Sequence, residues 1–246
     1  KLKDINNNDN SLSFLVDSEL CFINEIFCED QDNLRFHQNL SGSNAVLDYI
    51  DSYYYPINSR DDHYLGIHIN KNIKAGLISS IEPSNYSLRS VGIGLFSAEM
   101  MARSAFGADV LDNYLIIRFI TSSLIEVLYV DDGVLMVYGK YRISKNTVYL
   151  VKNIGNKAKC KDILSFLNHL VKVDRINTKK FNKVFIYQSN GNSPIIKKII
   201  NKNTKDVILL NLFDHNSKDG SNRTMSQVFS NLKFAEHGQL FRGLNV

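Results

Sequence analysis

The sequence predicts an α/β fold in which a mixed sheet is flanked by helices. Apolar runs rich in β-forming residues alternate along the chain with stretches whose apolar residues recur at helical spacing. Near the middle, residues 114–143 hold three consecutive apolar runs separated only by short turns. These runs are apolar at nearly every position, which is typical of a sheet covered on both faces. Antiparallel hairpins followed by parallel crossovers predict a mixed sheet.

The central three runs are expected to form an antiparallel meander. The first turn is Thr-Ser-Ser at 121–123 and the second is Asp-Asp-Gly at 131–133. A glycine after an aspartate is a strong hairpin signal, because glycine supplies the positive φ that a tight turn needs. Strands are therefore expected at residues 114–120, 124–130 and 134–143.

Elements before and after the meander follow from the spacing of apolar residues. At 71–81, Ile73, Leu77 and Ile81 recur every four residues and mark one face of a helix that Pro83 ends. Strands are expected at residues 12–16, 20–27, 64–69, 87–93, 148–151, 183–187 and 207–212. Helices are expected at residues 44–54, 71–81, 96–106, 160–173, 194–200 and 225–241.

The bulk composition excludes several classes of protein. Apolar residues make up 44% of the 246 residues, which is enough for a sizeable core. The net charge of +4 comes from 29 basic and 25 acidic residues and is read as spread along the chain, so nucleic acid is not expected as a partner. Three cysteines without CxxC spacing indicate reduced thiols. No apolar run reaches the ~18 residues of a membrane span.

Enzyme motifs are nearly absent from the sequence. It contains no GxSxG, no Walker phosphate loop and no HExxH. The Val-Gly-Ile-Gly stretch at 91–94 is interpreted as a turn, since a dinucleotide fingerprint needs a third glycine where Ser97 stands. The Asp-Asp-His stretch at 61–63 and His68 do not have the spacing of metal ligands.

One charged residue interrupts the first run of the meander. Arg118 is flanked by apolar residues on both sides. We expect its guanidinium to pair with an acidic side chain or to reach solvent, and contact with a phosphate is the alternative.

Three separated stretches resemble parts of one known fold. Residues 115–143 read LIIRFITSSLIEVLYVDDGVLMVYGKYRI, residues 183–212 read KVFIYQSNGNSPIIKKIINKNTKDVILLNL, and residues 234–245 read FAEHGQLFRGLN. In this order they are similar to the second-phosphate hairpin, the adenosine-binding segment and the closing segment of the actin-like ATPase fold, which is ribonuclease H-like. The resemblance is strongest to PilM-type proteins of type IV pili and to the cytoplasmic domains of GspL-type proteins of type II secretion.

The resemblance implies two lobes with a nucleotide cleft between them. The first lobe would span residues 1–112 and contain a small strand-helix insertion at about 64–106. The second lobe would span residues 113–246. The cofactor-binding residues that the resemblance places around the cleft are Ser122, Ser123, Asn190, Gly191 and Asn192.

The phosphate-binding turns of the family are altered in this sequence. The first turn reads Asp-Ser-Glu at 17–19, with no glycine that would let the backbone approach a phosphate. The second reads Arg-Phe-Ile-Thr-Ser-Ser at 118–123, where the family has an aspartate and a glycine. Without those carboxylates, neither magnesium binding nor activation of water is expected. These departures from the family pattern therefore predict no catalytic residues, no metal and no cofactor, with ATP binding kept as the alternative.

The functional hypothesis is a non-catalytic cytoplasmic scaffold or assembly-platform component of a type IV pilus or type II secretion apparatus. Its partners would be inner-membrane pilus or secretion platform proteins, and it would work at the inner face of that membrane. One alternative is an actin-like protein that binds ATP as a conformational switch. The other is a sugar-kinase-like phosphotransferase, for which Asp17 and Asp131 are the candidate carboxylates.

Overall fold

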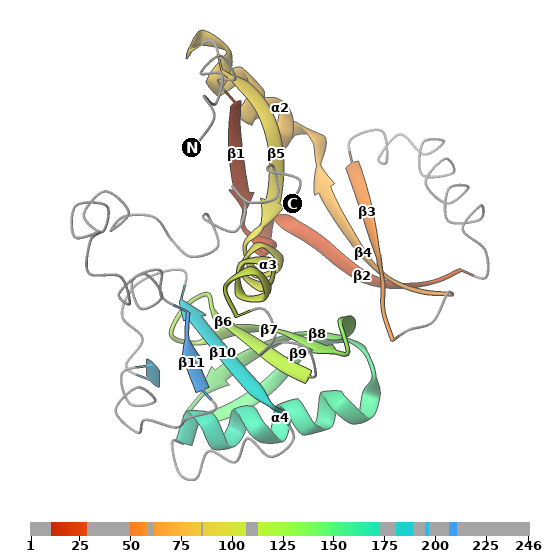
Figure 1. Cartoon of the computed structure of the whole chain (residues 1–246), viewed down its shortest axis with the longest axis vertical. Coiled ribbons are helices and arrows are strands. Elements are labelled where there is room, and N and C mark those ends of the chain that lie inside the picture. Colours follow the sequence, from red (N-terminus) through yellow and green to blue (C-terminus); the bar gives the residue numbers. More distant parts are fainter. Residues whose placement is uncertain are drawn as a thin grey trace, which may run out of the picture.

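The structure is a computed structural model, and Figure 1 shows how its elements are arranged. Its described strands form sheets of six, three and two strands. None of the helices it describes is long and apolar enough to cross a membrane. The structure describes residues 11–28, 50–58, 62–84, 86–106, 113–172, 181–188, 195–196 and 207–210.

The six-stranded sheet has the order β11-β10-β6-β7-β8-β9 and is mixed, as the sequence predicts. Strands β6 to β9 form an antiparallel meander, whereas β10 pairs in parallel with both β6 and β11. Asp132 and Gly133 have φ values of 49° and 74°, and these positive angles build the tight β7–β8 turn. The strands are β6 (Asn113–Phe119), β7 (Leu124–Asp131), β8 (Val134–Ser144), β9 (Thr147–Gly155), β10 (Lys183–Gln188) and β11 (Val207–Leu209).

Both faces of this sheet are buried because side chains alternate along each strand. Leu115 and Ile117 of β6 belong to a core that also contains the apolar face of α4 (Lys157–Lys172). Ile116, on the opposite face, belongs to a second core shared with α3 (Gly94–Phe106) and the three-stranded sheet. The uniform apolarity of β6 therefore has two causes, a helix on one side and the N-terminal part of the chain on the other.

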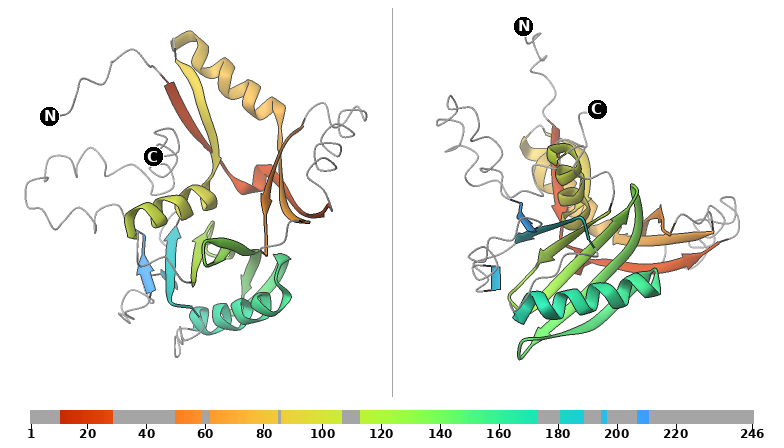
Figure 2. Two further views of the ribbon diagram at one scale, coloured as in Figure 1. Left: turned by 45° about the vertical axis from the view of Figure 1, so that its right-hand side comes forward. Right: turned by 60° about the horizontal axis from the view of Figure 1, so that its bottom comes forward.

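The N-terminal part forms two smaller sheets. β1 (Ser11–Val16) pairs in parallel with β5 (Ser87–Ile93), whereas β4 (His63–Asn70) lies between β2 (Cys21–Phe27) and β3 (Ile50–Pro56) in an antiparallel sheet. The chain leaves β4 through α2 (Lys71–Ile81) before it enters β5 (Figure 2, left). β1 and β2 are consecutive in sequence but belong to different sheets. A short 3-10 turn, η1 (Ser18–Leu20), redirects the chain between them, with the Asp17 carboxylate accepting the Glu19 backbone N–H.

Some sequence expectations were wrong. The helix expected at 44–54 is contradicted at residues 50–54, which belong to strand β3. Three consecutive tyrosines at 53–55 favour a strand, and pairing with β4 outweighs the weak helical spacing. The strand expected at 148–151 extends through β9, and the helix expected at 160–173 begins already at Lys157. Residues 195–196 are helical, but the remainder of the helix expected at 194–200, and the whole helix expected at 225–241, lie outside the described residues.

Candidate functional site

The turn between β1 and β2 meets the end of β6 at a buried arginine. Arg118 is 4% exposed. Its Nη2 lies 3.3 Å from Oδ2 of Asp17 and its Nη1 lies 3.1 Å from Oε2 of Glu126. Nη1 also lies 3.4 Å from Oγ of Ser18. One cation therefore joins the turn at 17–19 to strands β6 and β7, and it is paired with acids as the sequence led us to expect.

Glu126 is the most buried member of this cluster. It is fully buried and lies directly opposite Arg118 in the β6–β7 pairing. The Tyr138 hydroxyl of β8 donates to its other carboxylate oxygen, Oε1, at 2.9 Å. Burial, reinforced by the Glu126 charge, raises the pKa of Tyr138, so this phenol stays a donor. Both oxygens of the Glu126 carboxylate are therefore engaged by protein groups.

The guanidinium also packs tightly against neighbouring elements. A Cβ added to Gly94, the first residue of α3, would lie 3.4 Å from Cζ of Arg118 and 3.2 Å from the hydroxyl oxygen of Tyr187. Burial alone would lower the pKa of Arg118, but interactions with Tyr187, Glu126 and Asp17 outweigh it and raise the pKa. Arg118 is therefore a permanent cation that fills the space between the β1–β2 turn, the start of α3 and the sheet.

The carboxylates proposed for a phosphotransferase do not come together. Asp17 pairs with Arg118, whereas Asp131 lies at the opposite end of β7. There Asp131 lies 3.6 Å from Nζ of Lys159 and accepts the Tyr129 hydroxyl at 3.1 Å. Glu126 and Asp131 are five residues apart on one strand, a separation of roughly 17 Å. The geometry therefore does not support a shared catalytic site for Asp17 and Asp131.

The five residues implied by the resemblance are only partly described. Ser122 and Ser123 are exposed in the β6–β7 turn, where the Ser123 N–H donates to Oγ1 of Thr121 at 3.2 Å. Asn190, Gly191 and Asn192 lie outside the described residues, so grouping them with the two serines stays a prediction. Among the residues that the structure describes, no cluster of three or more His, Cys, Asp or Glu side chains could hold a metal ion.

Two histidines of β4 are held by protein partners. His63 lies 2.7 Å from Oε1 of Glu25, and it is stacked on Phe27 with 4.4 Å between ring centroids. His68 contacts Oγ of Ser52 at 2.8 Å and Oδ1 of Asn24 at 2.9 Å. Because the two histidines are five residues apart on one strand, they face opposite sides of the sheet. They cannot chelate one ion together.

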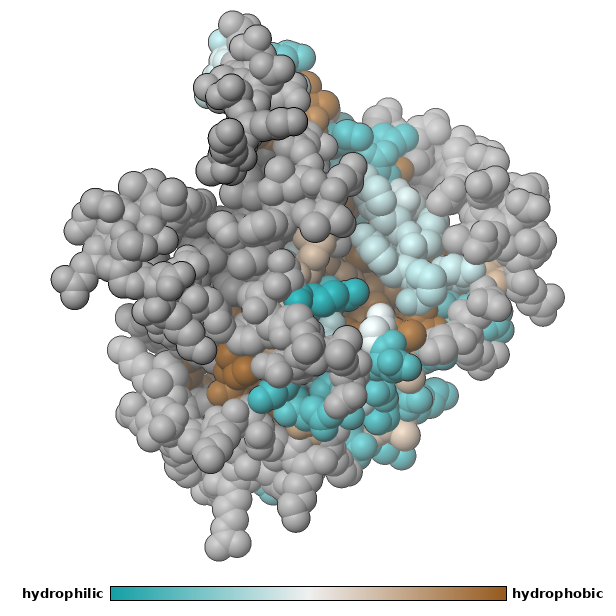
Figure 3. Space-filling view, viewed as in Figure 1, coloured by the Kyte–Doolittle hydropathy of each residue, from teal (hydrophilic) through white to brown (hydrophobic). Residues whose placement is uncertain are grey.

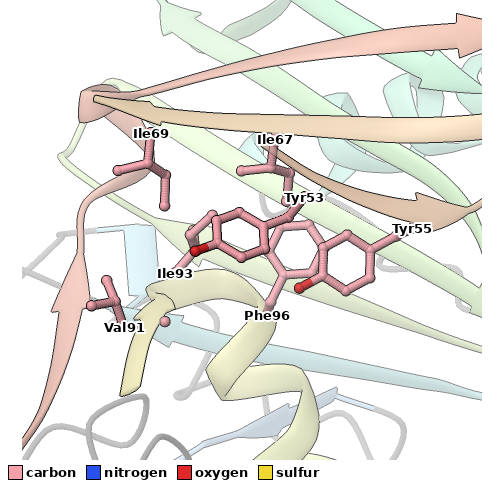
Figure 4. A pocket seen from close by; sticks show the side chains of 8 residues that line it. Tyr53, Tyr55, Ile67, Ile69, Val91, Ile93 and Phe96 are labelled. Carbon is pink, nitrogen blue, oxygen red and sulfur yellow. The ribbon is translucent and has the colours of Figure 1, made fainter. Parts of the chain in front are cut away.

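An apolar pocket lies between the three-stranded sheet and α3. Its volume is about 120 Å³, and Figure 4 shows the rings of Tyr53, Tyr55 and Phe96 gathered at its centre. Tyr53, at the rim, is 45% exposed, whereas Phe96 is 7% exposed. Small-molecule sites usually enclose ~300 Å³ or more, so the pocket suits one apolar side chain better than a nucleotide. Its lining residues are Tyr53, Tyr55, Ile67, Ile69, Val91, Gly92, Ile93 and Phe96.

Sequence reasoning missed this pocket because it placed a helix at 44–54. In a strand, Tyr53 and Tyr55 share one face of the sheet, whereas Tyr54 faces the other. The alternation of Ile67 and Ile69 on β4 was the matching signal. In the space-filling view, hydrophobic residues show in patches near the middle of the molecule, and hydrophilic residues gather at its lower right (Figure 3).

Comparison with known proteins adds information on the fold. No protein-family model matches the sequence, and no curated protein matches it. The PilM-PilN type IV pilus biogenesis complex contains a chain that aligns over 96% of this chain and 80% of its own length, with 8% identity and a TM-score of 0.56. This chain shares the fold of that pilus protein. The resemblance inferred from the sequence is therefore confirmed for the fold, and at 8% identity the likeness shows nothing further.

Two further solved structures resemble this chain more weakly. A protein from Bacteroides thetaiotaomicron VPI-5482 with an actin-like ATPase fold is 13% identical, with 80% of this chain and 67% of that chain covered and a TM-score of 0.38. The cytoplasmic domain of EpsL, an inner membrane component of the type II secretion system of Vibrio cholerae, is 7% identical. The alignment covers 75% of this chain and 64% of that domain, with a TM-score of 0.38. Scores this low carry no argument about the present chain.

Proposed function

We propose that this chain is a non-catalytic assembly component that works by binding partner proteins. The apparatus would be of the type IV pilus or type II secretion kind, and the chain would act at the cytoplasmic face of the inner membrane. The shared fold supports this proposal, because a structural neighbour with a TM-score of 0.56 is part of a pilus biogenesis complex. In this proposal the nucleotide cleft of the fold has only a structural role, and the partner protein binds at another surface.

The observation that carries the proposal is the ion cluster around Arg118. Of the two turns that would bind phosphate in a nucleotide-binding relative, the one at 17–19 pairs through Asp17 with Arg118, the first residue of the other at 118–123. Asp17 and Glu126 both pair with the guanidinium; the Glu126 side chain is fully buried, whereas the Asp17 side chain is 35% exposed. A carboxylate neutralised in this way is a poor ligand for magnesium. The cluster therefore supports a role without phosphoryl chemistry.

The tyrosine-lined pocket supplies the proposed partner-binding surface. Its lining side chains are aromatic or aliphatic, it is open at Tyr53, and it is bordered by β3, which has one neighbouring strand within the described part of the chain. An extended peptide could therefore pair with the outer edge of β3 while one apolar side chain enters the pocket. We assign this peptide to a platform protein of such an apparatus, because the pilus protein that shares the fold belongs to a complex.

Affinity capture from the source cell tests the proposal. The wild-type chain should retain a pilus or secretion platform protein, and Tyr53→Ser should retain at least about tenfold less, because it removes an aromatic ring that the bound peptide would bury. Tyr86→Ser is the matched control, because Tyr86 is similarly exposed at 43% and lies outside the pocket. Equal loss in both variants, or capture of no platform protein, would contradict the proposed function.

A further inference from the structure

The outer strand of the six-stranded sheet carries three consecutive exposed apolar residues. Tyr149, Leu150 and Val151 of β9 are 54%, 48% and 53% exposed. β9 lies at one edge of the sheet and packs beside α4 (Figure 1). Single exposed apolar residues are ordinary, but here three follow one another along one edge, with Tyr149 and Leu150 facing opposite sides of the strand.

Two features of β9 oppose pairing with a further strand. Lys152 is opposite Lys140 while Leu150 is opposite Tyr141, so Val151 is the extra residue of a β-bulge. The Asn168 side chain of α4 accepts the Val148 N–H at 2.8 Å and donates to the Val148 carbonyl at 3.5 Å. Bulges and covered backbone groups protect a sheet edge from strand addition. The side chains of this edge, not its backbone, are therefore the feature available to a partner.

The positive charge of the chain is concentrated around this edge. Residues 133–161 contain seven basic residues and no acidic one, so the other 22 basic residues of the chain are outnumbered by 25 acidic residues. The expectation that the positive excess is spread along the chain is therefore wrong. The seven are Lys140, Arg142, Lys145, Lys152, Lys157, Lys159 and Lys161.

Three of the seven cations are held by other parts of the protein. Lys140 lies 3.9 Å from Glu19, Lys159 lies 3.6 Å from Asp131, and Lys152 donates to the carbonyl of Ile23. The other four are exposed and form no ion pair with any residue that the structure describes. These are Arg142, Lys145, Lys157 and Lys161.

The four exposed cations surround the apolar residues from both faces of the sheet. Arg142 is the cross-strand partner of Tyr149, and Lys145 lies in the β8–β9 turn. Lys157 and Lys161 precede Asn168 by eleven and seven residues, so at about 100° per residue they lie within roughly 20° of the side of α4 that meets β9. We call Tyr149, Leu150, Val151 and these four cations the basic edge.

From this arrangement we infer that the basic edge binds an anionic membrane surface. Cations near such a surface are attracted to acidic lipid headgroups, tyrosine favours the interface, and leucine and valine can enter the acyl boundary. Single-stranded nucleic acid would instead be gripped by several stacking aromatic rings, and the edge has one. The inference does not depend on the pocket or on the proposed partner.

Sedimentation with lipid vesicles tests this inference on the whole chain. Vesicles of phosphatidylglycerol and phosphatidylcholine in equal parts should bind the protein, and phosphatidylcholine vesicles alone should not. Arg142→Ala combined with Lys161→Ala should weaken binding by about 30-fold, since each cation contributes about fivefold near an anionic surface. Leu150→Ser should weaken it by about fivefold through lost apolar burial.

The control for total charge is Lys71→Ala combined with Lys74→Ala, which removes two exposed cations from α2, one of them, Lys74, lying 3.8 Å from Asp51. This control should bind within about twofold of wild type if location matters and not total charge. No binding to anionic vesicles, or equal weakening by the two double variants, would overturn the inference. So would binding of duplex DNA through Arg142 and Lys161 in the absence of vesicle binding. Partner capture through Tyr53 should be unchanged in all edge variants, which separates this inference from the proposed function.

Discussion

Two regions beside the start of α3 differ in what fills them. Gly94 packs against the Arg118 guanidinium, while Phe96, two residues later, lines the apolar pocket. The Arg118 cluster is polar, buried and filled by the chain itself. The pocket is apolar, open at Tyr53 and empty of protein atoms over about 120 Å³. This contrast is why we propose that a partner binds at the pocket and not at the position of the Arg118 cluster.

Electrostatics explains why the first region must be closed. A buried ion is stable only when other groups pair with it, so Arg118 requires Asp17 and Glu126 to remain in place. An apolar pocket has no such requirement, because its lining loses only some packing energy when the pocket is open. The first region can therefore hold the parts of the molecule together, while the second can exchange a partner.

The largest expected effect is the removal of the central cation. Arg118→Met should lower the free energy of unfolding by about 3–5 kcal/mol, because it leaves the fully buried Glu126 without its counter-charge. Urea denaturation followed by circular dichroism measures this change. A loss below about 1 kcal/mol would mean that the cluster does not hold the parts together.

A double variant supplies the control for that result. Glu126→Gln in the Arg118→Met background removes the unpaired buried charge. The double variant should therefore lose clearly less free energy of unfolding than the two single variants lose in sum. Strict additivity would show that the two side chains act independently, against the geometry of their 3.1 Å contact.

A smaller effect is a difference in stability loss between variants of Phe96, at the floor of the pocket, and of Tyr53, at its rim. Phe96→Ala should lower the free energy of unfolding by about 3 kcal/mol, because Phe96 is only 7% exposed. Its ring stacks on those of Tyr55 and Tyr138, with 5.6 Å and 6.5 Å between ring centroids. Tyr53→Ser should cost no more than about 1 kcal/mol, since 45% of Tyr53 is already exposed. Thermal unfolding compares the two variants. Similar losses would indicate that Tyr53 is a core residue and not a binding rim.

The smallest expected effect concerns the sheet that carries the pocket. Burial lowers the pKa of His68 below 6.5, so between that lowered pKa and 6.5 the unfolded chain binds more protons than the folded one. Stability should therefore fall as the pH falls through this window. The melting temperature of His68→Gln should fall less steeply over the same window, and parallel slopes for the two proteins would contradict this role.

Local sequence patterns predicted much of the fold, but they did not predict contacts between residues that are far apart in the sequence. The glycine after Asp132 predicted the β7–β8 turn, and the four-residue spacing of Ile73, Leu77 and Ile81 predicted α2 with its observed bounds. The sequence also led us to expect an acidic partner for Arg118. It could not name Asp17, because these residues are 101 positions apart and meet only through tertiary packing.

The pocket escaped prediction for the same reason. Its lining comes from four elements, β3, β4, β5 and α3, and one of them was read as a helix. The division into lobes at residues 1–112 and 113–246 stays a prediction.

Isothermal titration of the chain with ATP and magnesium tests the central claim most directly. If Arg118 and its two carboxylates have replaced the nucleotide site, no binding should be detected tighter than about 1 mM. Saturable binding in the micromolar range, lost when magnesium is removed, would contradict the account and favour the alternative in which nucleotide acts as a switch.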